Sequence, residues 1–312
     1  MPKKKVSLIT SMFNCRDYID RFMENITNQT AFNDCDLILL DANEVSERPI
    51  VESYLEQYDN IKHFHISEFG ILNDPGVYGC WNLAIRNSDS DFITNTNLDD
   101  IRSRYAIESQ ISCLNDNPDI DVVYYRTLET DKPNETFENN SAEKEFPCLD
   151  YSFDSLMRVN SPHCQPMWRR SIHNELGLFN DTLMSAGDYE MWLRCAQAGI
   201  KMKKIDKISA INSVKVIVSP WQKGFTCGII MDTKSKMTTE QYELCSTIAR
   251  GMIKMATTDP HSTFLWGLRG FADDKNKNDK TMTISSVAEF DDDSNVVDFL
   301  EFLKNKRDKE LN

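Results

Sequence analysis

The sequence has no apolar run long enough to span a bilayer, so we expect no integral membrane segment. The apolar stretch that follows the opening lysines, residues 6–9, is too short for a secretory signal. The nine cysteines are scattered and odd in number, and none form a C-x-x-C pair, which argues against a zinc ribbon and a disulfide framework. We therefore expect a soluble cytoplasmic protein with reduced cysteines, or one held peripherally at the inner face of a membrane.

Positive charge is also in short supply. The chain carries 35 Lys and Arg against 49 Asp and Glu, a formal net charge of −14. Such a surface opposes nonspecific binding to nucleic acid or anionic lipid, and we expect no nucleic-acid partner. An acidic protein that binds an anionic ligand needs local arginines or lysines, a helix N-terminus or a metal ion to hold it.

Glycine-rich phosphate loops are absent as well. The sequence contains no G-x-G-x-x-G and no Walker motif, which disfavours a dehydrogenase and an NTPase. Its apolar content is ordinary, because 40% of the residues are hydrophobic and 10% are aromatic. These values are typical of a globular protein with a full core.

Short apolar runs alternate with helical patterns through the first half of the chain. Tyr18, Phe22 and Ile26 lie on one face of a predicted helix. The runs that we expect as strands are residues 6–10, 36–40, 61–66, 92–94 and 121–125. Strands separated by helices imply right-handed βαβ units, and continuous apolar strands are typical of burial on both faces. The fold class is therefore predicted as α/β with a mainly parallel sheet.

The second half is less regular. We expect a polar loop over residues 130–147, a helix that ends at Gly199, and late strands at 208–211 and 214–218. Beyond residue 238, two apolar stripes at helical spacing, one with Leu244 and Ile248 and one with Leu300 and Leu303, predict packing faces. We divide the chain into a domain of residues 1–235 and a helical C-terminal extension of residues 236–312, which offers a surface for a homo-oligomer.

The most informative motif is the segment of residues 96–100, Thr-Asn-Leu-Asp-Asp, which follows a predicted strand. Asp99 and Asp100 repel each other unless hydrogen bonds or a cation offset their charges. A divalent ion such as Mg²⁺ or Mn²⁺ would do so and would bridge to phosphate oxygens. The alternative is an Asp-rich turn in which Asp100 caps the next helix.

Four segments, taken together and in order, resemble the inverting glycosyltransferases of the GT-A fold, specifically glycosyltransferase family 2, over residues 5–220. Residues 6–14 are similar to the family's opening strand with its P-x-Y-N end, and residues 37–43 to the strand ending in V-V-D-D-G-S. Residues 76–85 and 91–100 resemble a nucleotide-contacting helix and the D-x-D metal motif, and residues 187–194 resemble E-D-Y-D-L-W-L-R. The chain departs from these motifs at Ala42, Asn43 and Asn97, which replace two acids and a glycine, and it lacks the proline.

The resemblance implies a Rossmann-like nucleotide-diphospho-sugar transferase sheet and a role for each matching position. The residues expected to bind the donor nucleotide are Phe13, Asn14, Asp41, Asn82 and Asn97, and those expected to hold a Mn²⁺ or Mg²⁺ cofactor are Asp99 and Asp100. A purely structural alternative stays open for two of them, because Asn14 suits a helix cap and Asp41 suits a turn. The amide at position 97 removes one charge from the metal motif.

Asp188 is the expected catalytic base, because direct displacement at the anomeric carbon requires a carboxylate to remove the proton of the acceptor hydroxyl. The alternative is that Asp188 caps the helix that follows it. Further candidates for binding the acceptor or the sugar are His163, Gln165, Glu190, Trp221 and Lys223.

The resemblance therefore predicts an inverting hexosyltransferase-like enzyme (EC 2.4) of polysaccharide biosynthesis. Its donor would be a nucleotide-diphosphate sugar, with UDP favoured, and its acceptor a glycan or lipid-linked hydroxyl. The alternative is a catalytically silent nucleotide- or sugar-binding protein on the same scaffold. A sugar-nucleotide nucleotidylyltransferase is disfavoured because residues 11–16, which follow the first strand, contain no glycine.

Overall fold

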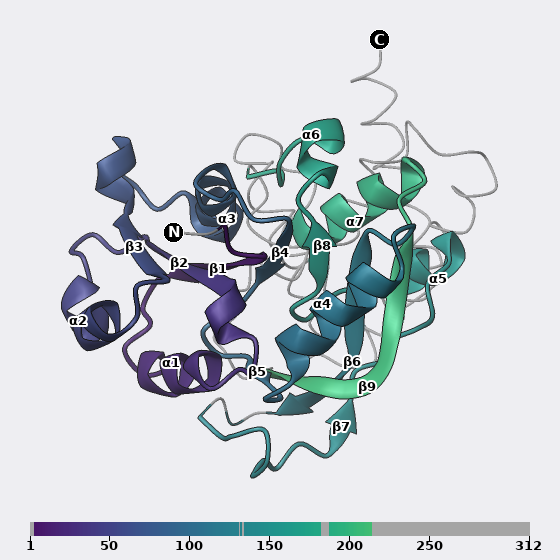
Figure 1. The fold of residues 1–312 in the computed structure, drawn as a ribbon, viewed down its shortest axis with the longest axis horizontal. Coiled ribbons are helices and arrows are strands. Elements are labelled where there is room, and N and C mark those ends of the chain that lie inside the picture. The colour runs from purple at the N-terminus through teal and green to yellow at the C-terminus, as the bar shows by residue number, and fades with distance from the viewer. Residues whose placement is uncertain (1–2, 131, 133, 182–186, 214–312) are drawn as a thin grey trace, which may run out of the picture. The chain divides into compact units, whose positions relative to one another are not determined.

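The computed structural model describes residues 3–130, 132, 134–181 and 187–213 (Figure 1). The chain divides into two compact units, one of residues 1–181 and 194–216 and the other of residues 182–193 and 217–312. The first unit contains the sheet, whereas the second is described only over residues 187–193. The predicted boundary at residue 235 and the predicted C-terminal extension lie outside the described residues.

Four parallel strands form one half of the sheet. They are β1 (Val6–Met12), β2 (Cys35–Asp41), β3 (Ile61–His65) and β4 (Phe92–Asn95), in the order β3-β2-β1-β4. In this register Val6 of β1 lies opposite Cys35 of β2 and Phe92 of β4. Every residue of β2 is buried, as is typical of a strand covered on both faces. The predicted α/β fold with parallel βαβ units is confirmed.

The other half of the sheet is mixed. β8 (Met167–Arg169) pairs antiparallel with β4 and with β6 (Val122–Thr130), and β9 (Met202–Ser213) runs parallel to β6. Two short strands, β5 (Ile101–Arg102) and β7 (Lys144–Glu145), pair antiparallel with β9 and β6. β7 lies inside the predicted polar loop, because the unpaired backbone of β6 offers it hydrogen bonds. β9 is longer than the predicted strand at 208–211, and residues 214–218 lie outside the described part of the chain.

Helices cover both faces of the parallel half. α1 (Ile19–Thr27) and α2 (Arg48–Gln57) lie on one side of β1–β3, and α3 (Gly76–Arg86) lies on the other (Figure 1). α4 (Ala106–Asp116) ends before Pro118, which cannot continue a helix. The other helices are the 3₁₀ segments η1 (Phe32–Asp34) and η2 (Ile66–Phe69), together with α5 (Phe153–Arg158), α6 (Ile172–Leu176) and α7 (Gly187–Gln197). None of the helices described is long and apolar enough to cross a membrane.

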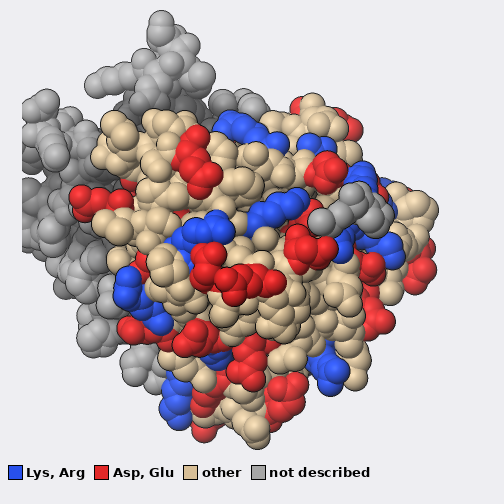
Figure 2. Space-filling view, turned by 60° about the vertical axis from the view of Figure 1, so that its left-hand side comes forward, with Lys and Arg blue, Asp and Glu red and all other residues tan. Residues whose placement is uncertain are grey.

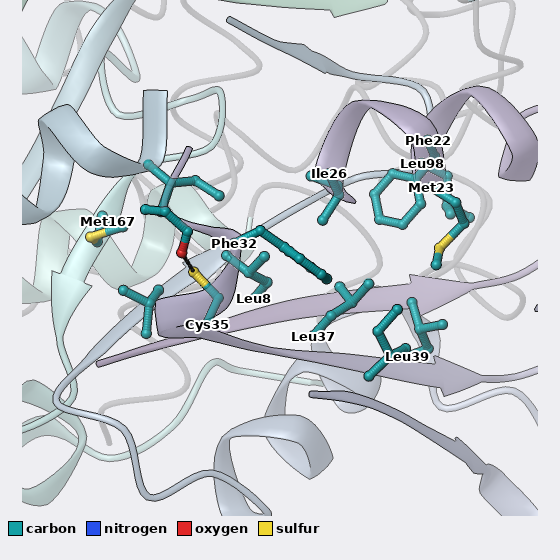
Figure 3. Close-up of a cluster of buried hydrophobic side chains, with 14 of the residues drawn as sticks. Leu8, Phe22, Met23, Ile26, Phe32, Cys35, Leu37, Leu39, Leu98 and Met167 are labelled. Atoms are coloured by element: carbon teal, nitrogen blue, oxygen red, sulfur yellow. Dashed lines mark hydrogen bonds between the residues drawn. The ribbon is translucent and has the colours of Figure 1, made fainter. Parts of the chain in front are cut away.

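A large apolar cluster joins α1 to the sheet, as the predicted stripe on this helix required. Figure 3 shows Phe22, Met23 and Ile26 of α1 facing Leu37 and Leu39 of β2. All five side chains are at most 1% exposed, so their burial contributes on the order of 1.5–3 kcal/mol each to stability. The helix is thereby fixed against the strands, with its opposite, polar face free for other contacts.

The cysteines in the described residues are all free, as predicted. Burial raises the pKa of the Cys35 thiol to about 12 and those of Cys80 and Cys148 to about 11. These thiols are therefore protonated at neutral pH and act as small packing groups rather than as nucleophiles. Cys227 and Cys245 lie outside the described residues.

Charged side chains of both signs are interspersed on the face shown in Figure 2, rather than gathered by sign. Surface ion pairs of this kind include Arg48 with Glu52, one helical turn apart at 3.1 Å, and Lys201 with Asp119 at 3.3 Å. Exposed pairs contribute little to stability, so these charges chiefly keep the surface hydrated.

Candidate functional site

The candidate site lies where β1, β2 and β4 end. Because these strands are parallel neighbours, the loops that follow them emerge at the same edge of the sheet. Residues 13–14 follow β1, residues 42–47 follow β2, and residues 96–100, which we call the acidic loop, follow β4. Three of the four segments that carry the sequence resemblance therefore meet at this edge.

The acidic loop is a hydrogen-bonded turn. The Thr96 N–H donates to the Ile9 carbonyl of β1 at 2.9 Å, and the Asp100 N–H donates to the Asn97 carbonyl at 3.4 Å. The side-chain amide of Asn97 donates to Asp100 Oδ2 at 2.8 Å. Asn97 therefore stabilises the buried carboxylate of Asp100, which an aspartate at position 97 would repel.

Asp99 presents the carboxylate best placed to bind a cation. It is half-buried, and burial raises its pKa, although its own backbone N–H and the charge of Arg21 act in the opposite direction. Among the described residues, Asp99 forms no ion pair and no three His, Cys, Asp or Glu side chains form a metal cage. One or two carboxylates, completed by water and by the phosphates of a substrate, are the ligand set typical of protein-bound Mg²⁺. The loop fits such an ion.

The loop after β1 is held by the loop after β2. Asn14 has a left-handed backbone at φ 50°, which asparagine tolerates better than most residues, and its N–H donates to Asn43 Oδ1 at 3.0 Å. Its own side chain is exposed and makes no hydrogen bond to the described residues, and Phe13 beside it is 49% exposed. The two residues predicted to contact the nucleotide are thus open to solvent at this edge.

Asp41 is fully buried at the end of β2, and its carboxylate accepts several internal hydrogen bonds. Asn43 donates its side-chain amide at 2.9 Å, Glu47 donates its backbone N–H at 2.6 Å, and His63 Nε2 lies at 3.1 Å. Burial opposes the ionisation of Asp41, but these hydrogen bonds outweigh it and hold its pKa well below the usual range. In this structure Asp41 organises the loop, so its predicted contact with the nucleotide base remains a prediction.

Asn82 also has an internal role. Its side-chain amide donates to the Phe179 carbonyl at 2.9 Å, and its Oδ1 accepts from the Phe179 N–H at 3.0 Å. The neighbouring Trp81 is 5% exposed and packs edge-on against Phe179. The predicted contact of Asn82 with the nucleotide is not tested by these contacts.

On the predicted acceptor side, Gln165 stands out. It is fully buried with a left-handed backbone at φ 52°, and neither polar atom of its amide has a partner among the described residues. His163 stacks on Phe146, with ring centroids 4.8 Å apart. Arg169, whose guanidinium binds the carbonyls of Ile120 and Leu114, has a structural role.

Asp188 and Glu190 lie in the first turn of α7, where carboxylates are favoured by the helix dipole. The helix begins at Gly187, so Asp188 lies inside its first turn rather than preceding it as a cap. Both residues belong to the second compact unit. Trp221 and Lys223 lie outside the described residues.

The structural roles of three residues at this edge were not evident from the sequence. Arg21 of α1 binds the carbonyls of the acidic loop, Asn43 links the loops after β1 and β2, and the buried Glu47 accepts from Arg16 Nε at 2.7 Å. Contacts of polar residues on a helix surface or in a turn cannot be predicted from a sequence pattern, because their partners are distant in the sequence.

The chain is similar to known glycosyltransferases. The family described as glycosyl transferase family 2 matches residues 7–176. An uncharacterised glycosyltransferase of Methanocaldococcus jannaschii is 25% identical over 66% of this chain and 70% of its own length. A chondroitin synthase of Escherichia coli is 24% identical over 65% of this chain. The chain spans 28% of that synthase and 31% of an uncharacterised glycosyltransferase of Rickettsia felis.

Solved structures share the fold. The S. aureus TarS fragment 1–349 in complex with UDP-GlcNAc superposes with a TM-score of 0.63 at 14% identity, over 82% of this chain and 74% of that chain. The mannosyltransferase PcManGT from Pyrobaculum calidifontis, in complex with GDP-Man and Mn²⁺, gives a TM-score of 0.55 at 13% identity, over 83% and 76%. With a family match over more than half of its residues and a GT-A-like sheet, the chain belongs to glycosyltransferase family 2.

Proposed function

We propose that this glycosyltransferase moves a sugar, with inversion, from a UDP-linked donor to a hydroxyl of a glycan or lipid-linked acceptor in polysaccharide biosynthesis. The observation that carries the proposal is the half-buried Asp99 carboxylate, which has no ion pair among the described residues. The TarS fragment, whose solved complexes contain UDP and UDP-GlcNAc, and the E. coli chondroitin synthase support this donor and acceptor class.

In the proposed donor site, Phe13, Asn14 and Asn97 contact the nucleotide, and Asp99 lies beside its diphosphate. Asp99, supported by Asp100, would hold a Mn²⁺ or Mg²⁺ ion, which offsets the charge that develops on the leaving diphosphate. Mn²⁺ accompanies GDP-Man in the solved PcManGT complex. Asp41 and Asn82 support the surrounding loops from the interior.

In the proposed reaction, the acceptor hydroxyl oxygen forms a bond to the anomeric carbon while the bond from that carbon to the diphosphate breaks. The hydroxyl proton passes to the Asp188 carboxylate, and the nucleoside diphosphate leaves with the bonding electrons. His163, Gln165 and Glu190, with Trp221 and Lys223 of the undescribed part, are the proposed contacts for the sugar and acceptor. The segment of residues 236–312 is proposed to offer the surface for a homo-oligomer.

Calorimetric binding of UDP and of GDP, with and without Mn²⁺, tests the donor site in the wild type and in Asp99→Asn. We expect Mn²⁺-dependent binding of UDP that Asp99→Asn removes and that the exposed control Asp59→Asn retains. Metal-independent binding of UDP by both proteins would contradict the role of the metal. Binding of GDP but not of UDP would mean that the donor sugar is linked to GDP.

A second measurement separates an enzyme from a silent binding protein. Transfer from a panel of UDP-sugars to glycan and lipid-linked acceptors should be lost in Asp188→Asn while UDP binding persists. Donor binding without transfer to any acceptor would favour the silent alternative, to which the amide at Asn97 also points.

A further inference from the structure

The acidic loop is fastened to α1 by one guanidinium. Arg21 Nη1 donates to the Asp100 carbonyl at 2.6 Å, and Nη2 donates to the Leu98 carbonyl at 2.7 Å. These two carbonyls flank Asp99 on either side. A single planar group therefore fixes the backbone immediately before and after the carboxylate proposed to bind the metal, with the geometry that arginine provides and lysine cannot.

The side chain of Leu98 fastens the same loop from the apolar side. Leu98 is 8% exposed and belongs to the core cluster with Phe22 and Met23 of α1, beside which Figure 3 shows it. Arg21 and the pair Phe22–Met23 are adjacent along α1, so one turn of helix holds both the backbone and the side chain of Leu98. Asp99, which lies between the two carbonyls that Arg21 holds, is half-buried.

One turn further along α1, Asn25 holds the chain that leaves the loop. Its Nδ2 donates to the Arg102 carbonyl at 2.9 Å, and its Oδ1 accepts from the Arg102 N–H at 2.9 Å. The Thr30 N–H then donates to the Arg104 carbonyl at 3.1 Å. Because Arg21 and Asn25 are four residues apart, they lie on one face of the helix and set the register of residues 98–104 against it.

The charge of Arg21 acts on the loop without a hydrogen bond to the carboxylate oxygens of Asp99. Burial lowers the pKa of Arg21, while the charges of Asp100 and Asp99 raise it, so the three groups interact electrostatically. Its hydrogen bonds within the described residues nevertheless go to backbone carbonyls. The cation thus reduces the repulsion between the two carboxylates and leaves the Asp99 oxygens available to a metal ion.

We propose that Arg21, assisted by Asn25, is a positioning residue for the metal site: it holds the Asp99 carboxylate in place to receive a divalent ion and the donor diphosphate. This inference rests on the proposed function, since it assumes that the acidic loop binds a metal. The competing interpretation is that Arg21 only stabilises the fold, which the design below separates from positioning.

The test measures Mn²⁺ binding, and UDP binding with and without Mn²⁺, by calorimetry in the full chain. The variants are Arg21→Met, Arg21→Lys and the control Arg48→Met, which removes an exposed guanidinium on α2. We expect Arg21→Met to weaken Mn²⁺ binding by about 10- to 100-fold, as is typical when an outer-shell partner of a metal ligand is removed. Arg21→Lys should fall between it and the wild type, and Arg48→Met should match the wild type.

Hydrogen exchange supplies a readout that needs neither metal nor activity. In Arg21→Met we expect faster exchange confined to the amides of residues 97–103, whereas a general loss of stability would raise exchange across the sheet as well. Asn25→Ala, which leaves Arg21 in place, should accelerate exchange at Arg102 and weaken Mn²⁺ binding less than Arg21→Met. If Arg21→Met does not fold, Arg21→Lys and Asn25→Ala carry the same comparison.

The outcomes are distinguishable. Unchanged Mn²⁺ affinity in folded Arg21→Met and Arg21→Lys, beside a wild type that binds Mn²⁺ through Asp99, would overturn the positioning role and leave the proposed function intact. Uniformly raised exchange with unchanged Mn²⁺ affinity would assign Arg21 to stability alone. A wild type that binds neither Mn²⁺ nor UDP would overturn the proposed function and this inference with it.

Discussion

The side chain of Asn82 forms two hydrogen bonds with the backbone of Phe179. Its Nδ2 donates to the Phe179 carbonyl at 2.9 Å, and its Oδ1 accepts from the Phe179 N–H at 3.0 Å. The two residues are 97 positions apart in the sequence. The side chain thus acts as a backbone strand would, and it ties α3 to the segment that follows α6. A residue whose position in the motif suggested a ligand contact thereby joins two distant segments of the fold.

Replacing Asn82 with Leu should destabilise the protein, because it removes both partners that Asn82 offers to buried backbone groups. We expect the free energy of unfolding to fall by about 1–3 kcal/mol. Urea denaturation measures the change, and Asn115→Leu at an exposed position of α4 is the control. A stable Asn82→Leu protein that has lost UDP binding would instead establish the predicted nucleotide contact.

Asp41 should make the free energy of unfolding depend on pH in the acidic range. Its pKa is depressed in the folded state, so its contribution is fully present above the unfolded-state pKa of about 3.9 and is lost as the pH falls towards the folded-state value. Urea unfolding of the wild type should therefore weaken as the pH falls below about 4. In Asp41→Asn, stability should be lower at neutral pH and depend less on pH in that window. An equal acid dependence in both proteins would refute the assignment.

Asp99 should have the opposite effect on the pH dependence of stability. Burial raises its folded-state pKa, so the metal-free protein binds this proton more tightly than the unfolded chain does and gains stability as the pH falls through that pKa. Asp99→Asn is expected to raise the melting temperature without metal and to abolish the stabilisation that added Mn²⁺ confers. Thermal melts with and without Mn²⁺ measure both effects, with Asp59→Asn as control. A variant that melts lower than the wild type would contradict the unfavourable burial of this charge.

Asn97→Asp would restore the acid that the metal motif lacks. The variant loses the 2.8 Å donor to Asp100 and adds a third negative charge to the acidic loop. We expect a lower melting temperature without metal and tighter Mn²⁺ binding, because the ion then offsets more repulsion. Calorimetry and thermal melts check the two changes together. Weaker Mn²⁺ binding would mean that the bond from Asn97 to Asp100 shapes the loop more than charge does.

The sequence was sufficient for the parallel half of the sheet. The apolar runs that became β1–β4 are local signals, and the helices between them carry the stripes that α1 and α4 bury. The mixed half was harder to predict. The two-residue strands β5 and β7 are too short for a period, and they exist because longer neighbours offer them backbone partners.

The candidate site was likewise predictable only in part. The type and order of residues such as Asn14, Asp99 and Asp188 were readable, because each is a chemical group within a motif of contiguous residues. Their surroundings were not, since Asp41 meets His63 and Arg21 meets Leu98 only when separate segments pack together.

The sequence by itself therefore determined the family, the parallel βαβ order and the identity of the acidic loop. Tertiary structure decided which of the polar groups are buried and which are exposed: Asp41 and Asn82 are enclosed by hydrogen bonds, whereas Asn14 and Asp99 reach solvent. It also brought Arg21 to the loop. The physical reason is that burial and hydrogen bonding depend on which distant segments come together, while motifs record only the chemistry of neighbours along the chain.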